Sequence, residues 1–315
     1  MKAIQKMRYK IVLPLFLSLA TTLAISCASS SYADERVESD NGNLKFRVFT
    51  SEDDGFLVNS VIVEGISEIL LVDAQLSRAN ALRVLDIIRE TGKKLSAIYI
   101  THEHPDHFLG LEVFKDAFPD VRILANSKVV DRINKIYPAK LRKWKELIGE
   151  KASSRQVPIT KFDGDCLLVG SSRVEIHKHL QGDTDENSFL WFPKERVAIT
   201  GDIVFDQAHL YTTETTPQER KNWIATLNSI EGLNPITVIP GHSQPGKVFD
   251  TRSSVEYTKN YLSVFEEELA KSKSAYELVG RMKEKFPQAG VLFSLKRSAE
   301  KIFTTSDPKR LDEIN

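Results

Sequence analysis

The sequence predicts an α/β chain built as an αββα sandwich, in which two β-sheets pack face to face and helices cover both outer sides. Short apolar runs typical of strands fall into two groups, one in each half of the chain, and each group is followed by segments of helical periodicity. Sheets and helices with one apolar side are stable when they stack in such layers. The chain shows no internal repeat and no low-complexity linker, so one domain should hold both groups.

The first group begins with three successive strands and then alternates helices with strands. The run at 76–92 has apolar residues three and four apart and stops at Gly92, which is typical of a helix. The helical stretch at 127–150 should break at Pro138, because proline lacks the backbone N–H that a helix interior needs. The expected elements are strands at 45–49, 56–65, 67–74, 95–100 and 121–126, and helices at 76–92, 110–118 and 127–150.

The second group begins with a denser run of strands and ends in helices. The expected elements are strands at 165–170, 173–180, 187–193, 196–202 and 236–240, a helix at 217–230 and a helical tail from about Ser253. Within the tail, Ser274 and Glu277 have the spacing of a capping box. These elements predict the second sheet and the helices that cover it.

Residues 1–33 have the order of a secretory signal peptide. Four cations precede an apolar run, and small residues fit a cleavage site after Ala33. We therefore expect a periplasmic or secreted protein whose mature domain is 34–315. A membrane anchor is less favoured, because Pro14 and polar residues interrupt a run already short for a bilayer span. A lipid-modified Cys27 is a further alternative, since "AISC" is similar to a lipoprotein cleavage box.

Removal of this leader leaves a mildly acidic chain with one cysteine. The formal net charge of the whole chain is zero, and the leader carries four cations and no anions. No long Lys/Arg tract remains to neutralise phosphates, so nucleic acid is not expected as a partner, and membrane contact is expected only through the leader or Cys27. Cys166 then has no disulfide partner and lies in an apolar run, which favours a buried structural thiol.

The stretch "THEHPDH" places three histidines and an aspartate directly after an apolar run. The end of a buried strand supplies rigidity and the following loop supplies reach, which a metal site with an open coordination position needs. His102 and His104 can converge on one cation, while Asp106 and His107 can turn toward a second. A solvated loop with chance histidines accounts poorly for three of them beside an aspartate.

Three further strand ends carry residues that can complete the site. "VAITGD" ends in Asp202, "ITVIPGH" ends in His242, and the strand at 173–180 runs into a loop that carries Asp183. Each feature alone is weak, because a Gly-Asp after a strand is usually a turn and a lone Gly-His is usually a loop. Their shared position after apolar runs makes the set stronger than its parts.

These segments resemble the metallo-β-lactamase-fold hydrolases over roughly residues 59–242. "HEHPDH" matches the family motif H-x-H-x-D-H in full, "ITGDIVF" is similar to its Gly-Asp strand end, and "VIPGHS" is similar to its last histidine segment. The resemblance implies the metallo-β-lactamase fold, a hydrolase with two divalent metal ions, and Asp73 as the structural aspartate that ends the opening strands. The implied ligands are His102 and His104 for one metal, Asp106, His107 and His242 for the other, and Asp202 between them.

One position departs from the family pattern. Most members have Gly-His-Thr at the third ligand of the first metal, and this chain reads "GDTDEN", which places Asp183 there. A carboxylate is a competent ligand, and the added negative charge favours harder ions such as Mn²⁺ or Fe²⁺ more than usual, although Zn²⁺ stays the first choice. His179 is the weaker alternative, because it and His177 alternate with the apolar face of their strand.

Two residues beyond Asp202 are candidates for contacting substrate. The loop that follows it should pass over the metal site, so His209 or Tyr211 could donate a proton or a hydrogen bond to a leaving group or an oxyanion. A surface histidine and a packed tyrosine are the alternatives. Asp106 and Asp202 are the residues expected to orient the nucleophile.

The function expected is hydrolysis of a small-molecule ester, lactone or related acyl substrate by a metal-bridging hydroxide. The Gly-Asp strand end at Asp202 is more similar to the family's lactonases and ester hydrolases than to its true β-lactamases, whereas export favours a β-lactam. The alternatives are a β-lactam hydrolase, an iron-dependent thiol oxygenase and a non-catalytic metal-binding module. The oxygenase is disfavoured because the second ligand set is complete.

Overall fold

The structure is a computed structural model that describes residues 35–38, 44–250 and 252–305. All of these belong to one compact unit that spans Ala33–Asn315. The expected leader, its cleavage site and Cys27 lie outside the described residues. None of the described helices combines the length and the apolar content that a membrane span requires.

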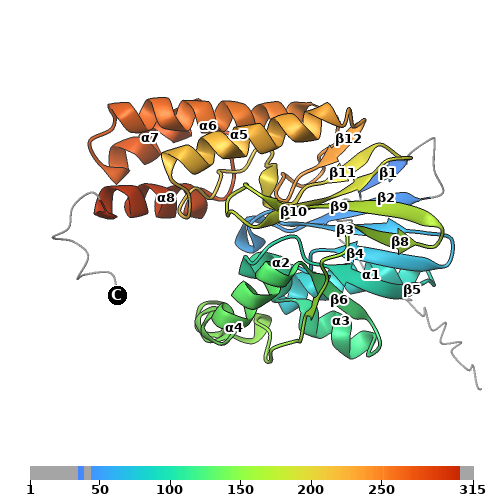
Figure 1. Cartoon of the computed structure of the whole chain (residues 1–315). Helices are drawn as coiled ribbons and strands as arrows, with labels where there is room; N and C mark the ends of the chain where they lie inside the picture. Colours follow the sequence, from blue (N-terminus) through green and yellow to red (C-terminus); the bar gives the residue numbers. More distant parts are fainter. Residues whose placement is uncertain (1–34, 39–43, 251, 306–315) are drawn as a thin grey trace, which may run out of the picture. The chain divides into compact units, whose positions relative to one another are not determined.

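The first sheet is formed mainly by the first half of the chain (Figure 1). Its strand order follows the sequence from β1 to β7, with antiparallel pairs as far as β4 and parallel pairs from β4 onward. Its strands are β1 (Glu35–Glu38), β2 (Lys45–Thr50), β3 (Asn59–Glu64), β4 (Glu68–Val72), β5 (Lys94–Tyr99), β6 (Arg122–Ala125) and β7 (Thr160–Lys161). The short strands β1 and β7 have no counterpart in the sequence prediction.

The second sheet has the order β12-β11-β10-β9-β8, and only β11 and β12 run parallel. Its strands are β8 (Cys166–Val169), β9 (Ser172–Leu180), β10 (Asn187–Phe192), β11 (Val197–Ile199) and β12 (Thr237–Ile239). The parallel pair matters for the site, because the carboxyl ends of β11 and β12 reach the same edge of the sheet.

Helices cover the outer face of each sheet (Figure 1). On the first sheet lie α1 (Arg78–Glu90), α3 (Leu111–Ala117) and α4 (Ser127–Ile148), with the one-turn helix α2 (Pro105–Phe108) beside them. On the second sheet lie α5 (Pro217–Gly232), α6 (Ser253–Lys271), α7 (Ala275–Lys285) and α8 (Leu292–Thr305). Within the described residues there are also three 3-10 turns: η1 (Asp53–Gly55), η2 (Gly149–Lys151) and η3 (Gly201–Ile203).

Among the described residues, three apolar cores hold these layers together. The alternating direction of side chains along each strand decides which core a residue joins. In β4, Leu70 and Val72 belong to the core between the sheets, whereas Ile69 and Leu71 belong to the core beneath α1, α3 and α4. Successive strand side chains point to opposite faces, so one apolar strand serves two layers. The third core lies under α5 to α8. The predicted αββα sandwich is therefore confirmed.

The predicted break at Pro138 is wrong. Helix α4 runs through it without interruption. The neighbouring Tyr137 is fully buried, packs edge-on against Phe108 at 4.9 Å between ring centroids, and accepts a hydrogen bond from Val157 N at 3.4 Å. Pro138 itself is exposed, so water can reach the carbonyl that its missing N–H leaves free. Packing around Tyr137 offsets the loss of one helical hydrogen bond.

Two smaller expectations also change. The strand predicted at 56–65 begins only at Asn59, because Phe56 and Leu57 adopt positive φ angles of 67° and 60° that end the extended backbone before it. Cys166 is half-buried at the start of β8 rather than buried, and it is a free thiol. The sequence pattern predicted the strand that contains Cys166 but not how far its side chain is buried.

The capping box predicted in the helical tail forms only in part. Ser274 accepts a hydrogen bond from Glu277 N and caps α7, but the Glu277 carboxylate accepts from Lys273 N at 2.8 Å instead of from the cap residue. A complete capping box begins α5, where Thr216 and Glu219 each accept a hydrogen bond from the other's backbone N–H.

Candidate metal centre

Four segments bring polar side chains to one edge of the two sheets. The histidine-rich stretch follows β5, Asp183 lies between β9 and β10, Asp202 lies in η3 after β11, and His242 follows β12. A hydrogen bond of 2.7 Å from Ser188 Oγ to the carbonyl of Thr101 ties the loop after β5 to the second sheet. The predicted positions after strand ends therefore converge.

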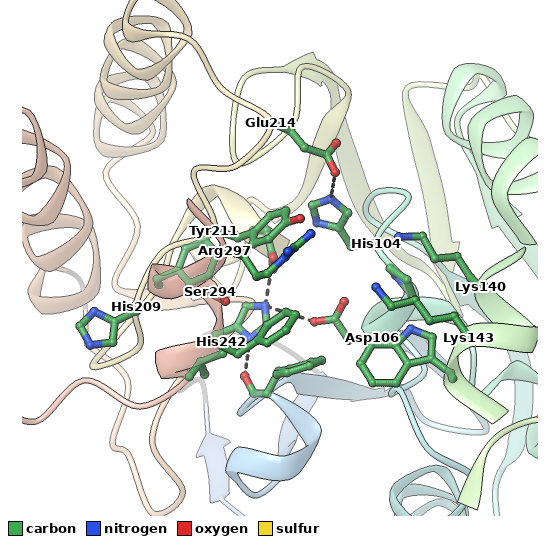
Figure 2. Close-up of a pocket in the computed structure, with 17 residues that line it drawn as sticks. His104, Asp106, Lys140, Lys143, His209, Tyr211, Glu214, His242, Ser294 and Arg297 are labelled. Carbon is green, nitrogen blue, oxygen red and sulfur yellow. Dashed lines mark hydrogen bonds and ion pairs between the residues drawn. The ribbon is translucent and has the colours of Figure 1, made fainter. Parts of the chain in front are cut away.

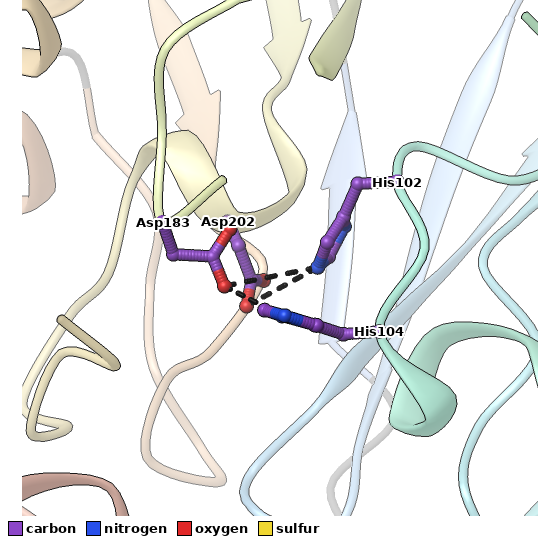
Figure 3. Close-up of side chains that lie close together, drawn as sticks. All are labelled: His102, His104, Asp183 and Asp202. Carbon is purple, nitrogen blue, oxygen red and sulfur yellow. Dashed lines mark ion pairs between the residues drawn. The ribbon is translucent and has the colours of Figure 1, made fainter. Parts of the chain in front are cut away.

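The first ligand group consists of His102, His104, Asp183 and Asp202 (Figure 3). Each of the four offers a ligand atom within 4.8 Å of the others, and all four are buried. His104 Nδ1 lies 2.7 Å from Asp183 Oδ2. His102 Nε2 lies 3.9 Å from that same oxygen and 3.7 Å from Asp202 Oδ2.

The second ligand group consists of Asp106, His107 and His242, whose ligand atoms also lie within 4.8 Å of one another. The Nε2 atoms of His107 and His242 lie 3.8 and 3.7 Å from Asp106 Oδ2. Asp202 reaches this group too, with Oδ1 3.1 Å from His107 Nε2 and Oδ2 2.9 Å from His242 Nε2. Its carboxylate therefore lies between the two groups.

Hydrogen bonds fix the orientation of the ligand rings. His107 Nδ1 lies 2.8 Å from Asp73 Oδ2, and Asp73 also accepts from the backbone N and Oγ1 of Thr101 at 2.9 Å each. Asp73 adopts a positive φ of 61° at the end of β4, a conformation that aspartate tolerates better than most residues. His242 Nδ1 lies 2.6 Å from the carbonyl of Phe56. The opposite nitrogen of each ring then faces the centre.

Three further contacts hold the first ligand group. Asn187 Nδ2 donates to Asp183 Oδ1 at 3.0 Å, which leaves Oδ2 facing the histidines. His102 Nδ1 lies 3.1 Å from Thr101 Oγ1. His104 Nε2 lies 3.5 Å from a Glu214 carboxylate oxygen, so that the Nδ1 of this ring faces Asp183.

His102 Nε2 is buried and has no hydrogen-bond partner among the described residues, because the nearest carboxylate oxygens, of Asp202 and Asp183, lie 3.7 and 3.9 Å away. Other ligand atoms meet one another, as His104 Nδ1 meets Asp183 Oδ2 at 2.7 Å and His107 Nε2 meets Asp202 Oδ1 at 3.1 Å. An unpaired buried polar atom is costly, and all of these atoms point into one small volume. Imidazole nitrogens and carboxylate oxygens in this number are the usual ligands of divalent cations such as Zn²⁺. The residues present therefore fit a pair of divalent metal ions.

The charges of the two ligand groups depend on one another. Burial raises the pKa of Asp183 to about 7, although His104 works against this. Burial also opposes ionisation of Asp202, but the surrounding histidines hold the pKa of its carboxyl well below the usual value. Burial and the neighbouring His107 lower the pKa of His102. Such opposed shifts are typical of a site that binds a compensating charge.

The structure places Asp183, and not His179, beside the other ligands. His179 Nδ1 lies 2.7 Å from a Glu186 oxygen, outside both ligand groups. The other histidine of β9, His177, stacks on Phe189 with 4.3 Å between ring centroids. That Asp183 replaces a histidine ligand stays a prediction, but its position agrees with it.

A cavity of about 180 Å³ opens beside the two ligand groups (Figure 2). Tyr211 lies in it, edge-on to the His104 ring with 5.3 Å between centroids. His209 lines the same cavity but lies apart from both ligand groups, at the left of Figure 2, and its Nδ1 is 3.0 Å from Tyr261 Oη. Burial lowers the pKa of His209 to about 4. Tyr211 is thus the better placed of the two predicted substrate contacts.

Sequence reasoning missed two sets of residues around the site. Asn187, at the start of β10, and Glu214, in a loop, contact ligands directly, but a single amide or carboxylate carries no periodic signal. Lys140, Lys143 and Arg297 line the cavity from α4 and α8. Their helical positions were predictable, whereas the approach of these helices to the site was not.

The chain matches the model of the metallo-beta-lactamase superfamily over residues 53–242. It is also similar to the hydroxyacylglutathione hydrolase of Methylobacterium nodulans, with 27% identity over 135 residues that make up 43% of this chain and 44% of that protein. The corresponding protein of another Methylobacterium strain matches with the same identity and coverage. The chain thus spans less than half the length of these curated relatives.

Solved structures support the same fold. A metallo-beta-lactamase from Pontibacter korlensis superimposes with a TM-score of 0.55 and 16% identity, covering 73% of this chain and 99% of that one. The DIM-1 metallo-beta-lactamase superimposes with a TM-score of 0.53 and 20% identity, covering 74% of this chain and 97% of that one. Fold, family match and ligand groups together support the predicted metal-dependent hydrolase.

Proposed function

The chain belongs to the metallo-beta-lactamase superfamily, and from that premise we propose that it is a hydrolase of small acyl substrates, such as esters, thioesters or lactones, that works with two divalent metal ions. The observation that carries the proposal is the position of Asp202, whose carboxylate lies within 3.7 Å of His102, 3.1 Å of His107 and 2.9 Å of His242. One carboxylate between two sets of ligands is what a paired-metal site requires.

The roles of the residues follow from the two ligand groups. His102, His104 and Asp183 would hold one metal, Asp106, His107 and His242 would hold the other, and Asp202 lies next to both groups. Two bound divalent cations supply a Lewis acid for the substrate carbonyl and lower the pKa of bound water from about 15.7 toward about 7. Asp106 and Asp202 would each accept a hydrogen bond from this water and so orient it, and Tyr211 lines the cavity from which substrate would arrive.

The preference for an acyl ester or thioester rests on two supports. The curated relatives are named as hydrolases of a hydroxyacylglutathione, an acylated thiol compound. The cavity is lined by apolar rings such as Phe56, Trp144 and Phe293 next to the ligand groups, which suits a substrate with an apolar portion. Zn²⁺ is the first choice of metal, and the carboxylate-rich first group leaves Mn²⁺ and Fe²⁺ as alternatives.

Export is part of the proposal. We propose that residues 1–33 direct the chain to the periplasm or the exterior and are removed there, because their charge and apolar order are those of a signal peptide. The mass of the protein recovered from an expressing bacterium tests this. Cleavage after Ala33 gives an unmodified N-terminus, whereas retention of Cys27 with a lipid mass supports the lipoprotein alternative, and an intact leader contradicts both.

The test of the function uses metal analysis and a substrate screen on the mature protein. We expect two equivalents of Zn²⁺ or Mn²⁺ and hydrolysis of chromogenic esters, thioesters or lactones in preference to a cephalosporin or a phosphodiester. A single iron with oxygen consumption on thiols would instead support the oxygenase alternative. Metal-free protein without turnover would support the non-catalytic module.

A matched pair of variants tests the ligand assignment. Asp183→Ala should lose metal from the first group and lower kcat/KM by more than about 100-fold, because loss of a residue that merely orients a ligand already costs about 10–100-fold. His179→Ala removes an imidazole only four residues away that lies outside both groups, so it should keep both metals and full turnover. The reverse result would assign His179 as the ligand.

A further inference from the structure

Aromatic rings from three distant segments form one wall of the cavity. Phe56 follows η1, Trp144 belongs to α4 and Phe293 belongs to α8. The Phe56 ring lies 5.6 Å from Trp144 in an edge arrangement and 5.4 Å from Phe293 in a stacked arrangement, measured between centroids. Aromatic contacts at these distances are favourable, so the wall is a packed surface that can bind an apolar group.

Three cations line the same cavity. Lys140 and Lys143 lie one helical turn apart on the face of α4 that carries Trp144, and Arg297 lies one turn beyond Phe293 on α8. In Figure 2 the two lysines reach in from one side and Arg297 from the other, above Asp106 and His242. The two helices therefore present all three cations and two of the three aromatic rings of the wall.

These cations are only weakly neutralised by neighbouring anions. Among the described residues, neither Lys140 nor Lys143 forms an ion pair, and Arg297 pairs only with the exposed Glu300 at 3.3 Å. Burial, followed by the charges of Lys140 and Arg297, lowers the pKa of Lys143, so the three cations affect one another.

Two of the three anions that line the cavity are engaged elsewhere. Asp106 and Asp202 belong to the ligand groups, where bound metal would neutralise them. The third, Glu214, lies 3.5 Å from His104 Nε2 and also interacts with the charge of Lys140, so three cations face one carboxylate that is already partly engaged. The outer part of the cavity is therefore positive next to an apolar wall, and the inner part holds the ligand groups.

We propose that the substrate is an anionic acyl compound, whose negatively charged group binds Lys140, Lys143 and Arg297 while its apolar portion packs on Phe56, Trp144 and Phe293. This inference rests on the proposed function, because it names the substrate class for the same site. It assigns α4 and α8 as the elements that determine specificity, since all three cations and two of the three aromatic rings come from them. Uncharged esters would be processed less efficiently than their anionic counterparts, chiefly through KM.

The test compares 4-acetoxybenzoate with 4-acetoxybenzamide, which differ only in the charged group. At low salt, the wild-type protein should prefer the benzoate in kcat/KM by about fivefold to tenfold, the size expected of a few partly exposed ion pairs, and the preference should fall as salt is raised. Lys143→Met with Arg297→Met should bring the ratio of the two kcat/KM values close to one. Lys145→Met, an exposed lysine of α4 outside the cavity, should leave the ratio unchanged.

A binding measurement separates this inference from the proposed function. Calorimetry with 3-phenylpropanoate and 3-phenylpropanamide reports the preference for a negative charge without turnover. If neither ester is hydrolysed but the double variant binds the propanoate more weakly than wild type does, the proposed function fails and the anion site stands. If esters are hydrolysed and the anionic preference is absent, or survives in the double variant, the inference is overturned while the hydrolase stands.

Discussion

Gly241 offers a direct test of whether the position of Asp202 controls the site. An added Cβ at Gly241 would lie 2.2 Å from Asp202 Oδ1 and 2.6 Å from the carbonyl carbon of Gly201. Nonbonded heavy atoms pack at about 3.5 Å, so Gly241→Ala must push the Asp202 carboxylate away by about 1 Å. The Gly201 backbone cannot make room easily, because Gly241 N donates to its carbonyl at 2.9 Å.

The expected consequence is a misplaced ligand in a folded protein. A displacement of about 1 Å at a reacting site can cost about 100-fold in rate, and overpacking of this kind costs about 1–3 kcal/mol of unfolding free energy. We therefore expect Gly241→Ala to bind fewer than two metal equivalents and to lose about 100-fold in kcat/KM. Plasma mass spectrometry of the dialysed protein and ester kinetics measure the two quantities.

The matched control is Gly232→Ala at the end of α5, where nothing lies within 4 Å of the added Cβ. This variant should keep its metal and its activity. Circular dichroism on both variants separates local displacement from unfolding. Gly241→Ala with two metals and wild-type kinetics would refute the argument that Asp202 needs this close approach.

Three further predictions follow from the same geometry. Asp73→Asn weakens the hydrogen bond that orients His107 and should lower metal affinity by about 10–100-fold. A competition titration with a metal chelator measures this affinity. Unchanged affinity would mean that Asp73 stabilises the fold without orienting the ligand. Burial lowers the pKa of His209 to about 4, whereas a histidine in the unfolded chain has a pKa of about 6.5. The unfolded chain therefore binds the proton first, and the free energy of unfolding of the metal-free protein should fall as the pH drops from about 6.5 to about 4. In urea unfolding, His209→Gln should remove up to about 3 kcal/mol of this change in the free energy of unfolding with pH. If the free energy of unfolding falls equally steeply with pH in wild type and in His209→Gln, the prediction is contradicted. Chelation with EDTA should lower both turnover and the melting temperature, reversibly on adding Zn²⁺, and a melting temperature indifferent to metal would argue against two bound ions.

Much of the candidate site could be read from the sequence because its residues occupy positions that local patterns mark. A buried strand is an apolar run, and the residue just beyond it lies at a sheet edge, so the histidine-rich stretch, Asp202 and His242 could be grouped by pattern alone. The same reasoning separated Asp183, beyond a strand end, from His179 within the strand. Their close approach is seen only in the structure, because it depends on the packing of the two sheets.

Local patterns failed where packing outweighs propensity. Pro138 predicts a helix break, but α4 continues. The neighbouring Tyr137 is buried, packs on Phe108 and accepts a hydrogen bond from Val157 N, and these contacts stabilise the helix at this point. The cavity shows the same limitation over a longer range. Lys143 and Arg297 are separated by more than a hundred residues, and nothing in either helix indicates the other.

Short segments of the sequence predict the two-sheet architecture and the residues suited to bind metal, because strand periodicity and ligand type are local properties. The position of Asp202 between two ligand groups and the cavity shared by α4 and α8 become visible only in the folded chain. They come from contacts between segments far apart in the sequence, which are set by how the layers pack and not by any local preference.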